Sequence, residues 1–236
     1  MKVEIWSDVM CPFCYIGKRK FENALTQFPG KNQVEVIWKS FQLDPSTVTN
    51  PELTTIQHLA DKKGWSIEQA REATQYTTKL AKDVGLTFNF DKAVVANSFD
   101  AHRLSHLAKT HGKQDELEEQ LFAAYFTDGK NTADHATLTE LAAAIGLDAH
   151  EVGGVLSSNQ YAQDVQSDIH RAQQVGVRGV PFFVFDNKYA ISGAQETPTF
   201  LQGLTQAYAE WEKSNQAPVQ LVEGAVCTPD GCDPEN

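Results

Sequence analysis

Hydrophobic and polar residues alternate near the start of the chain in a way that predicts a strand, a helix and a second strand. Residues 2–7 alternate as a short strand does, and β-branched residues fill much of 34–38. Between them, residues 12–28 carry a helical pattern that Pro12 suits as an opening residue and that Pro29 stops. This order predicts the beginning of a parallel βαβ unit.

The rest of the pattern is helical in the middle of the chain and strand-like near its end. From Thr54 to about Gln174 it predicts several helices, and no strand-like run competes with them. Residues 179–185 and 189–192 then predict a β-hairpin, and residues 197–213 predict a last helix. A βαβ front and a ββα back around a helical block predict the α/β class, as a thioredoxin-like fold with a large all-helical insertion.

This order of elements divides the chain into three expected parts. Residues 1–48 and 170–215 form the thioredoxin-like domain, residues 49–169 form the helical insertion domain, and residues 216–236 form a C-terminal tail. The tail carries two of the four cysteines, Cys227 and Cys232.

Composition narrows the classes of function that fit the chain. Its 236 residues have a net charge of -11, which argues against nucleic acid or an anionic membrane as the main partner. No apolar run approaches the roughly 20 residues of a membrane span. The first residues lack the apolar core and cleavage site of a signal peptide, so we expect a cytoplasmic protein. The oligomeric state cannot be predicted from these features.

Cys11 and Cys14 are the strongest candidates for chemistry. Four cysteines are too few for a disulfide scaffold, and in a reducing compartment redox or metal chemistry becomes their leading explanation. Cys11 falls between a predicted strand and a predicted helix, where exposed backbone N–H groups favour a thiolate. Cys14, one turn later, is placed to attack a mixed disulfide on Cys11 and release it. The pattern therefore predicts a redox-active CxxC site.

A zinc site is the main alternative for this spacing, because zinc ribbons also use it. Such a site needs a second ligand pair, and the other two cysteines lie at the far C-terminus with wider spacing. His102 and His106 have the spacing of helical metal ligands, but the chain shows no obvious third ligand for them. We therefore expect no metal and no resident cofactor.

Pro181 is the second signal for a redox site. In thioredoxin-like folds, a cis-proline precedes the strand that faces the cysteine pair. Val180 and Pro181 before an apolar run suit that position, and the backbone of Val180 would then pair with an extended substrate. Phe13, between the two cysteines, is a further candidate for substrate contact.

Four segments together resemble the FrnE-like branch of the DsbA family. In chain order they are residues 7–17 (SDVMCPFCYIG), 97–104 (NSFDAHRL), 176–184 (GVRGVPFFV) and 193–195 (GAQ). The resemblance implies a thioredoxin fold with a helical insertion and thiol–disulfide oxidoreductase activity, with isomerase activity left open. The implied partners are disulfide-containing proteins or small disulfides. It also suggests that Asn97 and Arg103 face the cleft between the insertion and the thioredoxin-like domain, although an ordinary salt bridge explains Arg103 equally well.

Two related groups of enzymes share this architecture and keep other functions open. 2-Hydroxychromene-2-carboxylate isomerases and kappa-class glutathione transferases usually carry serine where Cys11 stands, and they bind glutathione. A glutathione-dependent transferase or isomerase is therefore an alternative, and glutathione is a candidate co-substrate. A non-enzymatic partner-binding or zinc-binding protein is another.

The tail cysteines suggest an accessory redox pair. The four residues between Cys227 and Cys232 include Pro229, Asp230 and Gly231, which favour a turn that brings the two sulfurs together. A structural role is weak in magnitude, since closing so short a loop gains only about 2 kcal/mol. We therefore expect either exchange with the first pair or an idle tail.

Overall fold

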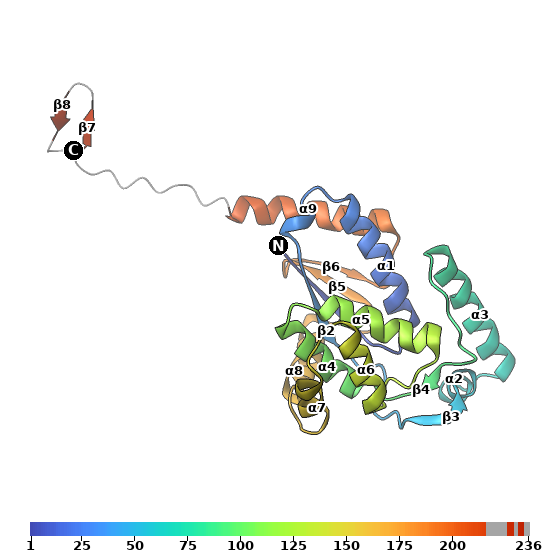
Figure 1. Ribbon diagram of the computed structural model, residues 1–236. Coiled ribbons are helices and arrows are strands. Elements are labelled where there is room, and N and C mark those ends of the chain that lie inside the picture. Colours follow the sequence, from blue (N-terminus) through green and yellow to red (C-terminus); the bar gives the residue numbers. More distant parts are fainter. Residues whose placement is uncertain (216–225, 229–230, 234–236) are drawn as a thin grey trace.

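A four-stranded mixed sheet lies at the centre of the computed structural model (Figure 1), which describes residues 1–215, 226–228 and 231–233. The strand order is β2 (Glu35–Ser40), β1 (Lys2–Ser7), β5 (Phe182–Phe185) and β6 (Tyr189–Ser192). β1 pairs parallel with β2 and antiparallel with β5, and β6 pairs antiparallel with β5. This arrangement confirms the expected strand–helix–strand front and hairpin back of a thioredoxin-like fold.

Two helices cover one face of this sheet and pack against each other. They are α1 (Pro12–Gln27), which follows β1, and α9 (Thr197–Asn215), which follows the hairpin. Phenylalanines fill the space beneath them: the Phe183 and Phe200 rings lie 4.6 Å apart, and Phe21 lies 5.5 Å from Phe183. Because these aromatic side chains come from β5, α1 and α9, the core joins segments nearly 180 residues apart.

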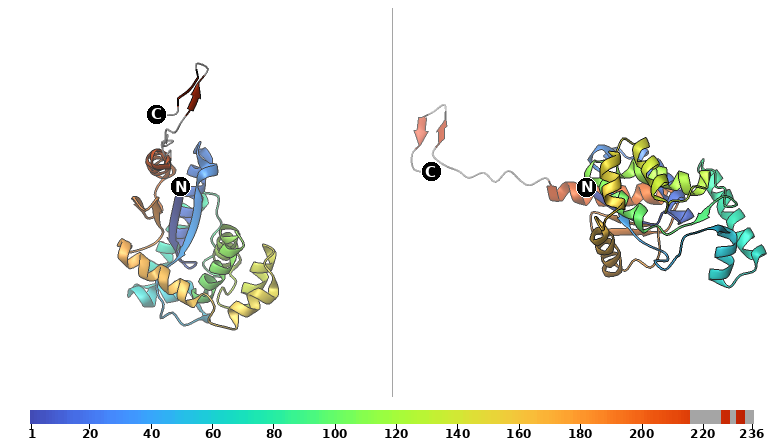
Figure 2. Two further views of the ribbon diagram at one scale, coloured as in Figure 1. Left: turned by 90° about the vertical axis from the view of Figure 1, so that its left-hand side faces the viewer. Right: turned by 60° about the horizontal axis from the view of Figure 1, so that its bottom comes forward.

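Helix α8 (Ala162–Val175) packs against β2 at the sheet's other face, as the turned views in Figure 2 show. Trp6 is fully buried beneath it, and its indole nitrogen donates a hydrogen bond of 3.0 Å to the Asp168 backbone carbonyl. The Asp168 carboxylate accepts a bond of 2.6 Å from Lys39 and one of 3.0 Å from the Ser40 backbone. These contacts fix α8, the last helix before the hairpin, against the sheet.

The insertion is helical, as expected, with one small addition. Its elements in chain order are β3 (Asn50–Thr54), α2 (Thr55–Lys63), α3 (Ile67–Asp83), β4 (Val94–Val95), α4 (Phe99–Thr110), α5 (Gln114–Ala123), the π-helical turn η2 (Ala124–Asp128), α6 (His135–Ala144) and α7 (Ala149–Leu156). The expectation that no strand interrupts it is corrected by β3 and β4. They pair at only two register positions with a shift between them, so neither carries the alternation that marks a strand in sequence.

The insertion packs directly on α1, the helix that begins just after Cys11. The Tyr15 ring stacks on Phe122 at 5.0 Å, and its hydroxyl donates a hydrogen bond of 2.6 Å to Glu119. Lys18, almost fully buried, lies within 4 Å of three carboxylates, those of Glu22, Asp115 and Glu119. One continuous hydrophobic core therefore includes side chains from both the sheet and the insertion. Within the described residues, no helix is long and apolar enough to cross a membrane.

Candidate active site

Cys11 lies at the junction between β1 and α1. Its backbone N–H donates a hydrogen bond of 2.9 Å to the Asp8 carbonyl, which closes the turn after the strand. Cys11 is the residue that precedes the first turn of the helix, and Pro12 occupies that turn, where its missing N–H costs nothing. The Cys14 N–H donates to the Cys11 carbonyl at 3.0 Å, so the two cysteines are one helical turn apart.

The Val180–Pro181 peptide bond is cis and lies beside Cys11. The Cys11 sulfur lies 3.5 Å from the Val180 carbonyl oxygen, in hydrogen-bonding range for a thiol donor. Gly17 of α1 approaches Pro181 so closely that a Cβ at this glycine would come within 2.9 Å of the proline Cγ. The structure thus brings together four residues singled out in the sequence, namely Cys11, Cys14, Val180 and Pro181.

The two thiols have different surroundings. Cys14 is fully buried, and burial raises the pKa of its thiol well above the usual value, with a further upward contribution from neighbouring Cys11. Cys11 is 4% exposed and lines a cavity, whereas Cys14 lies behind it. Of the two cysteines, Cys11 is therefore the one that borders the cavity.

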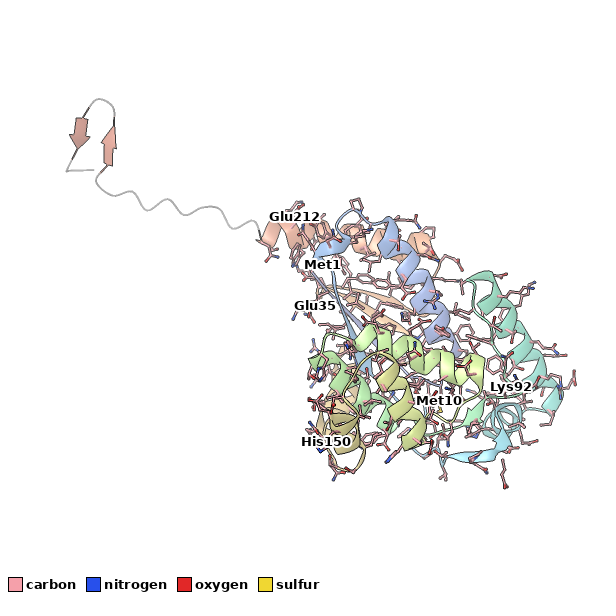
Figure 3. All side chains as sticks on the ribbon, viewed as in Figure 1. Met1, Met10, Glu35, Lys92, His150 and Glu212 are labelled. Atoms are coloured by element: carbon pink, nitrogen blue, oxygen red, sulfur yellow. The ribbon has the colours of Figure 1, made fainter. Side chains whose placement is uncertain are left out.

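The cavity beside Cys11 has a volume of about 460 Å³. One wall comes from the start of α1 and from Val180, and the opposite wall comes from α2, α3, β4 and η2 of the insertion. Phe13, which is 40% exposed, lines it, and its contact with substrate stays a prediction. Met10 also lines it, and Figure 3 shows Met10 toward the side of the molecule that carries α2 and α3, far from Met1.

Asn97 and Arg103 do not line the cavity beside Cys11, and their place at a cleft between the insertion and the thioredoxin-like domain stays a prediction. Arg103 is buried and donates from Nε to the Gln160 carbonyl at 2.9 Å and from a guanidinium nitrogen to Asp100 at 2.6 Å. Its other terminal nitrogen donates to the backbone carbonyls of Val155, in the last turn of α7, and of Ser158, just after it. Arg103 ties α4 to the segment between α7 and α8.

Asn97 holds the loop that follows β2. Its side-chain amide donates to the Thr47 carbonyl at 2.8 Å, and its carbonyl oxygen accepts from Gln42 at 3.1 Å. It borders a second cavity, of about 490 Å³, that does not include either active-site cysteine. In segment 97–104, Asn97 and Arg103 thus hold neighbouring loops in place, because their side chains bind backbone carbonyls of those loops.

Asp8 and His102 form a buried acid–base pair that was not found from the sequence. Asp8, fully buried, accepts a hydrogen bond of 2.7 Å from the Leu43 N–H, and its other oxygen lies 3.5 Å from His102 Nε2. Burial lowers the pKa of His102, but the carboxylates of Asp8 and Glu118 outweigh it and raise the pKa above the usual value. Asp8 and His102 are too far apart in sequence for any local pattern to pair them.

The two histidines of α4 and the two tail cysteines were also candidates from the sequence. His106 Nε2 lies 3.2 Å from an Asp168 oxygen, so the two histidines of α4 pair with different carboxylates. The part of the chain that the structure describes contains no group of three side chains arranged to hold a metal. Cys227 and Cys232 are register partners on the short strands β7 (Val226–Thr228) and β8 (Gly231–Asp233). Their side chains lie outside the described structure, so their accessory role stays a prediction.

Comparison with known proteins gives a consistent picture. A sequence model of the family described as DSBA-like thioredoxin domain matches residues 2–205. Protein YwbO from Bacillus subtilis (strain 168) is 30% identical over 206 residues, which cover 86% of this chain and 95% of that protein.

Two solved structures extend this comparison to the fold. A probable DsbA oxidoreductase from Streptomyces coelicolor is 40% identical, with a TM-score of 0.83 over 99% of this chain and 98% of its own. A 2-hydroxychromene-2-carboxylate isomerase is 15% identical, with a TM-score of 0.64 over 91% of this chain and 98% of its own. At that identity the second likeness concerns the fold alone.

Proposed function

The chain belongs to the family of DsbA-like thioredoxin domains, and on that premise we propose that it catalyses thiol–disulfide exchange through Cys11 and Cys14. The observation that carries this proposal is the difference between the two thiols. Cys11 lines the cavity and contacts the Val180 carbonyl, whereas Cys14 is fully buried one turn behind it. This arrangement suits an attacking thiol and a resolving thiol.

The proposed reaction has two steps. The Cys11 thiolate attacks one sulfur of a substrate disulfide, forms a mixed disulfide and releases the other sulfur as a thiolate. Cys14 then loses its proton and attacks the Cys11 sulfur, which forms the Cys11–Cys14 disulfide and releases the second substrate thiolate. The substrate gains two electrons and the enzyme loses two; the reverse sequence oxidises a dithiol. The reduction potentials of the enzyme and its partner set the direction.

The surroundings of each thiol support these roles. The raised pKa of Cys14 keeps its proton in place until the mixed disulfide has formed next to it. The Val180 carbonyl and the Phe13 ring border the position that a substrate bound to Cys11 would occupy. The proposed partners are disulfide-containing proteins or small disulfides, with glutathione as a candidate co-substrate, in the cytoplasm.

A glutathione-dependent transferase or isomerase is the second candidate function. The shared fold with 2-hydroxychromene-2-carboxylate isomerase is what keeps it open. A thiol at Cys11 with a second thiol one turn behind it favours exchange instead, because a transferase has no need for a resolving sulfur.

Reduction of insulin and of oxidised glutathione by the purified protein tests the proposed function. We expect Cys11→Ser to lower both rates by about 100-fold or more, because it removes the attacking sulfur. The double variant Cys227→Ser/Cys232→Ser keeps the Cys11–Cys14 pair and serves as the matched control. Full activity in Cys11→Ser, or its loss only in the double variant, would place the chemistry elsewhere.

A further inference from the structure

The cavity beside Cys11 has the size and lining of a small-molecule site. Its volume of about 460 Å³ falls in the range of such sites, which is roughly 300–1,000 Å³. Apolar side chains from the insertion form much of its wall; they are Leu59, Trp65, Phe90, Val95 and Tyr125. With Phe13 and Leu43 on the other side, these residues surround a space that fits an aromatic ring.

The three threonines of the cavity add little polarity, because their hydroxyl protons are already used. Thr55 donates to the Ala93 carbonyl at 2.9 Å. Thr74 and Thr77 donate to carbonyls of their own helix, α3, at 2.9 and 2.8 Å. His58, Tyr125 and the indole of Trp65 also line the cavity and can still donate, so the preference for an apolar ligand rests on the predominance of apolar side chains in the wall. The interior favours an apolar group.

The rim of the cavity is basic. Lys62 and Lys63 both border it from the last turn of α2, and Asp44 borders it beside Lys62. Lys62 forms an ion pair with Asp44, whereas the ion pairs among the described residues do not include Lys63. Lysines are common in the last turn of a helix, so their charge alone carries no argument. Their place at the mouth of an apolar cavity, on a chain of net charge -11, gives the rim a local preference for an anion.

From these observations we infer the substrate class of the proposed exchange reaction, on which this inference rests. The cavity binds a low-molecular-weight disulfide whose sulfur carries an aromatic group with a carboxylate. The ring occupies the apolar space, its sulfur meets Cys11, and the carboxylate lies near Lys63. Exchange then proceeds by the two steps given above, and the aromatic thiolate is the product that leaves.

Four disulfides test this inference, because they carry the aromatic ring and the carboxylate together, singly or not at all. They are 5,5′-dithiobis(2-nitrobenzoate), which has both, 4,4′-dithiodipyridine, which has only the ring, 3,3′-dithiodipropionate, which has only the carboxylate, and bis(2-hydroxyethyl) disulfide, which has neither. Each rate constant with the reduced protein is divided by that of the same disulfide with free dithiothreitol, which removes differences in leaving-group chemistry. We expect the normalised rate of 5,5′-dithiobis(2-nitrobenzoate) to exceed that of bis(2-hydroxyethyl) disulfide by about tenfold or more.

Variants of residues at the rim and in the wall test whether the cavity causes the preference for aromatic disulfides with a carboxylate. Lys63→Gln should lower the normalised rates of the two carboxylate disulfides about threefold or more and leave dithiodipyridine unchanged. Trp65→Ala should lower the rates of the two aromatic disulfides selectively. The matched controls are Lys79→Gln and Tyr76→Ala, two exposed α3 residues outside the cavity, which should change none of the four rates.

The outcomes separate a failure of the inferred substrate class from a failure of the proposed exchange activity. Equal normalised rates for all four disulfides, a normalised rate for oxidised glutathione that matches the best of them, or variants that lower every rate equally would overturn the substrate class alone. If none of the disulfides reacts with Cys11, the proposed function itself is wrong.

Discussion

At the scale of single residues, Asp8 and His102 form a buried acid–base pair whose protonation depends on pH. Burial alone would lower the pKa of His102, but Asp8 and Glu118 raise it above its usual value. The folded protein therefore holds the His102 proton more tightly than the unfolded chain does. The resulting stabilisation is fully present below the unfolded pKa of about 6.5 and is lost as the pH rises through the higher folded pKa.

This dependence of stability on pH gives a testable prediction. We expect His102→Gln to lower the free energy of unfolding by about 3 kcal/mol at pH 6, because it leaves the Asp8 carboxylate buried without its partner. The loss should become smaller toward pH 9. Urea denaturation of parent and variant across this range measures it, with the exposed His150→Gln as the control. A difference that stays constant or grows with pH would contradict the assignment.

Sequence identified the residues whose role depends on local geometry. Cys11, Cys14 and Pro181 were found because a strand end, a helix start and a cysteine spacing are visible within a few positions of the chain. For Arg103 the sequence left a cleft position and an ordinary salt bridge open, and the structure shows a salt bridge to Asp100. The sequence could not decide between them, because the direction in which a helix face points depends on what packs against it. Asp8 and His102 meet only through the tertiary fold, so no periodicity could have paired them.

At the scale of elements, a charge cluster joins α1 to the insertion. The Lys18 ammonium is almost fully buried, lies within 4 Å of Glu22, Asp115 and Glu119, and sits 5.9 Å from the centre of the Trp38 ring. Burial opposes its charge, but the three carboxylates outweigh this cost and raise the pKa of Lys18. Lys18 thus compensates three negative charges at the boundary between α1 and α5.

Removing the charge of Lys18 tests whether the cluster stabilises the packing of α1 against the insertion. Lys18→Met keeps the apolar stem but removes the one cation that contacts all three carboxylates; Arg19 still pairs with Glu22 and Glu119, so we expect a loss of about 2 kcal/mol in the free energy of unfolding. Lys20→Met is the matched control on the same helix. Within the described part of the chain Lys20 pairs only with the exposed Glu196, so its removal should cost less than about 1 kcal/mol. Equal losses in urea denaturation would mean that the cluster does not couple the elements.

The strong elements of the fold followed from the sequence, and the weak ones did not. β1, α1, β2 and the β5–β6 hairpin were predicted because their periodicity extends over several residues. The ladder of β3 and β4 was missed, since its few register contacts arise only when loops around the insertion are brought together. The wall that α2 and α3 contribute to the cavity was also missed, because their sequences show a buried face without showing what it faces.

At the scale of the whole molecule, the insertion and the thioredoxin-like part together make one site. The sheet and α1 position the reacting sulfur and the cis-proline, while the insertion supplies the opposite wall of the cavity. One continuous core connects the two, so the wall is held in a fixed relation to Cys11. The cysteine pair thus carries the proposed chemistry, and the insertion carries the proposed selection of substrate.

The most direct test of this account is a trapped intermediate. In a Cys227→Ser/Cys232→Ser background, Cys14→Ser removes the resolving sulfur and should accumulate one mixed disulfide when treated with 5,5′-dithiobis(2-nitrobenzoate). Intact mass and peptide mapping should place the single adduct on Cys11, whereas the same background with Cys14 intact should lose the adduct and form the Cys11–Cys14 disulfide. A stable adduct on Cys14 in a Cys11→Ser variant, formed at the same rate, would contradict the assignment of Cys11 as the attacking thiol.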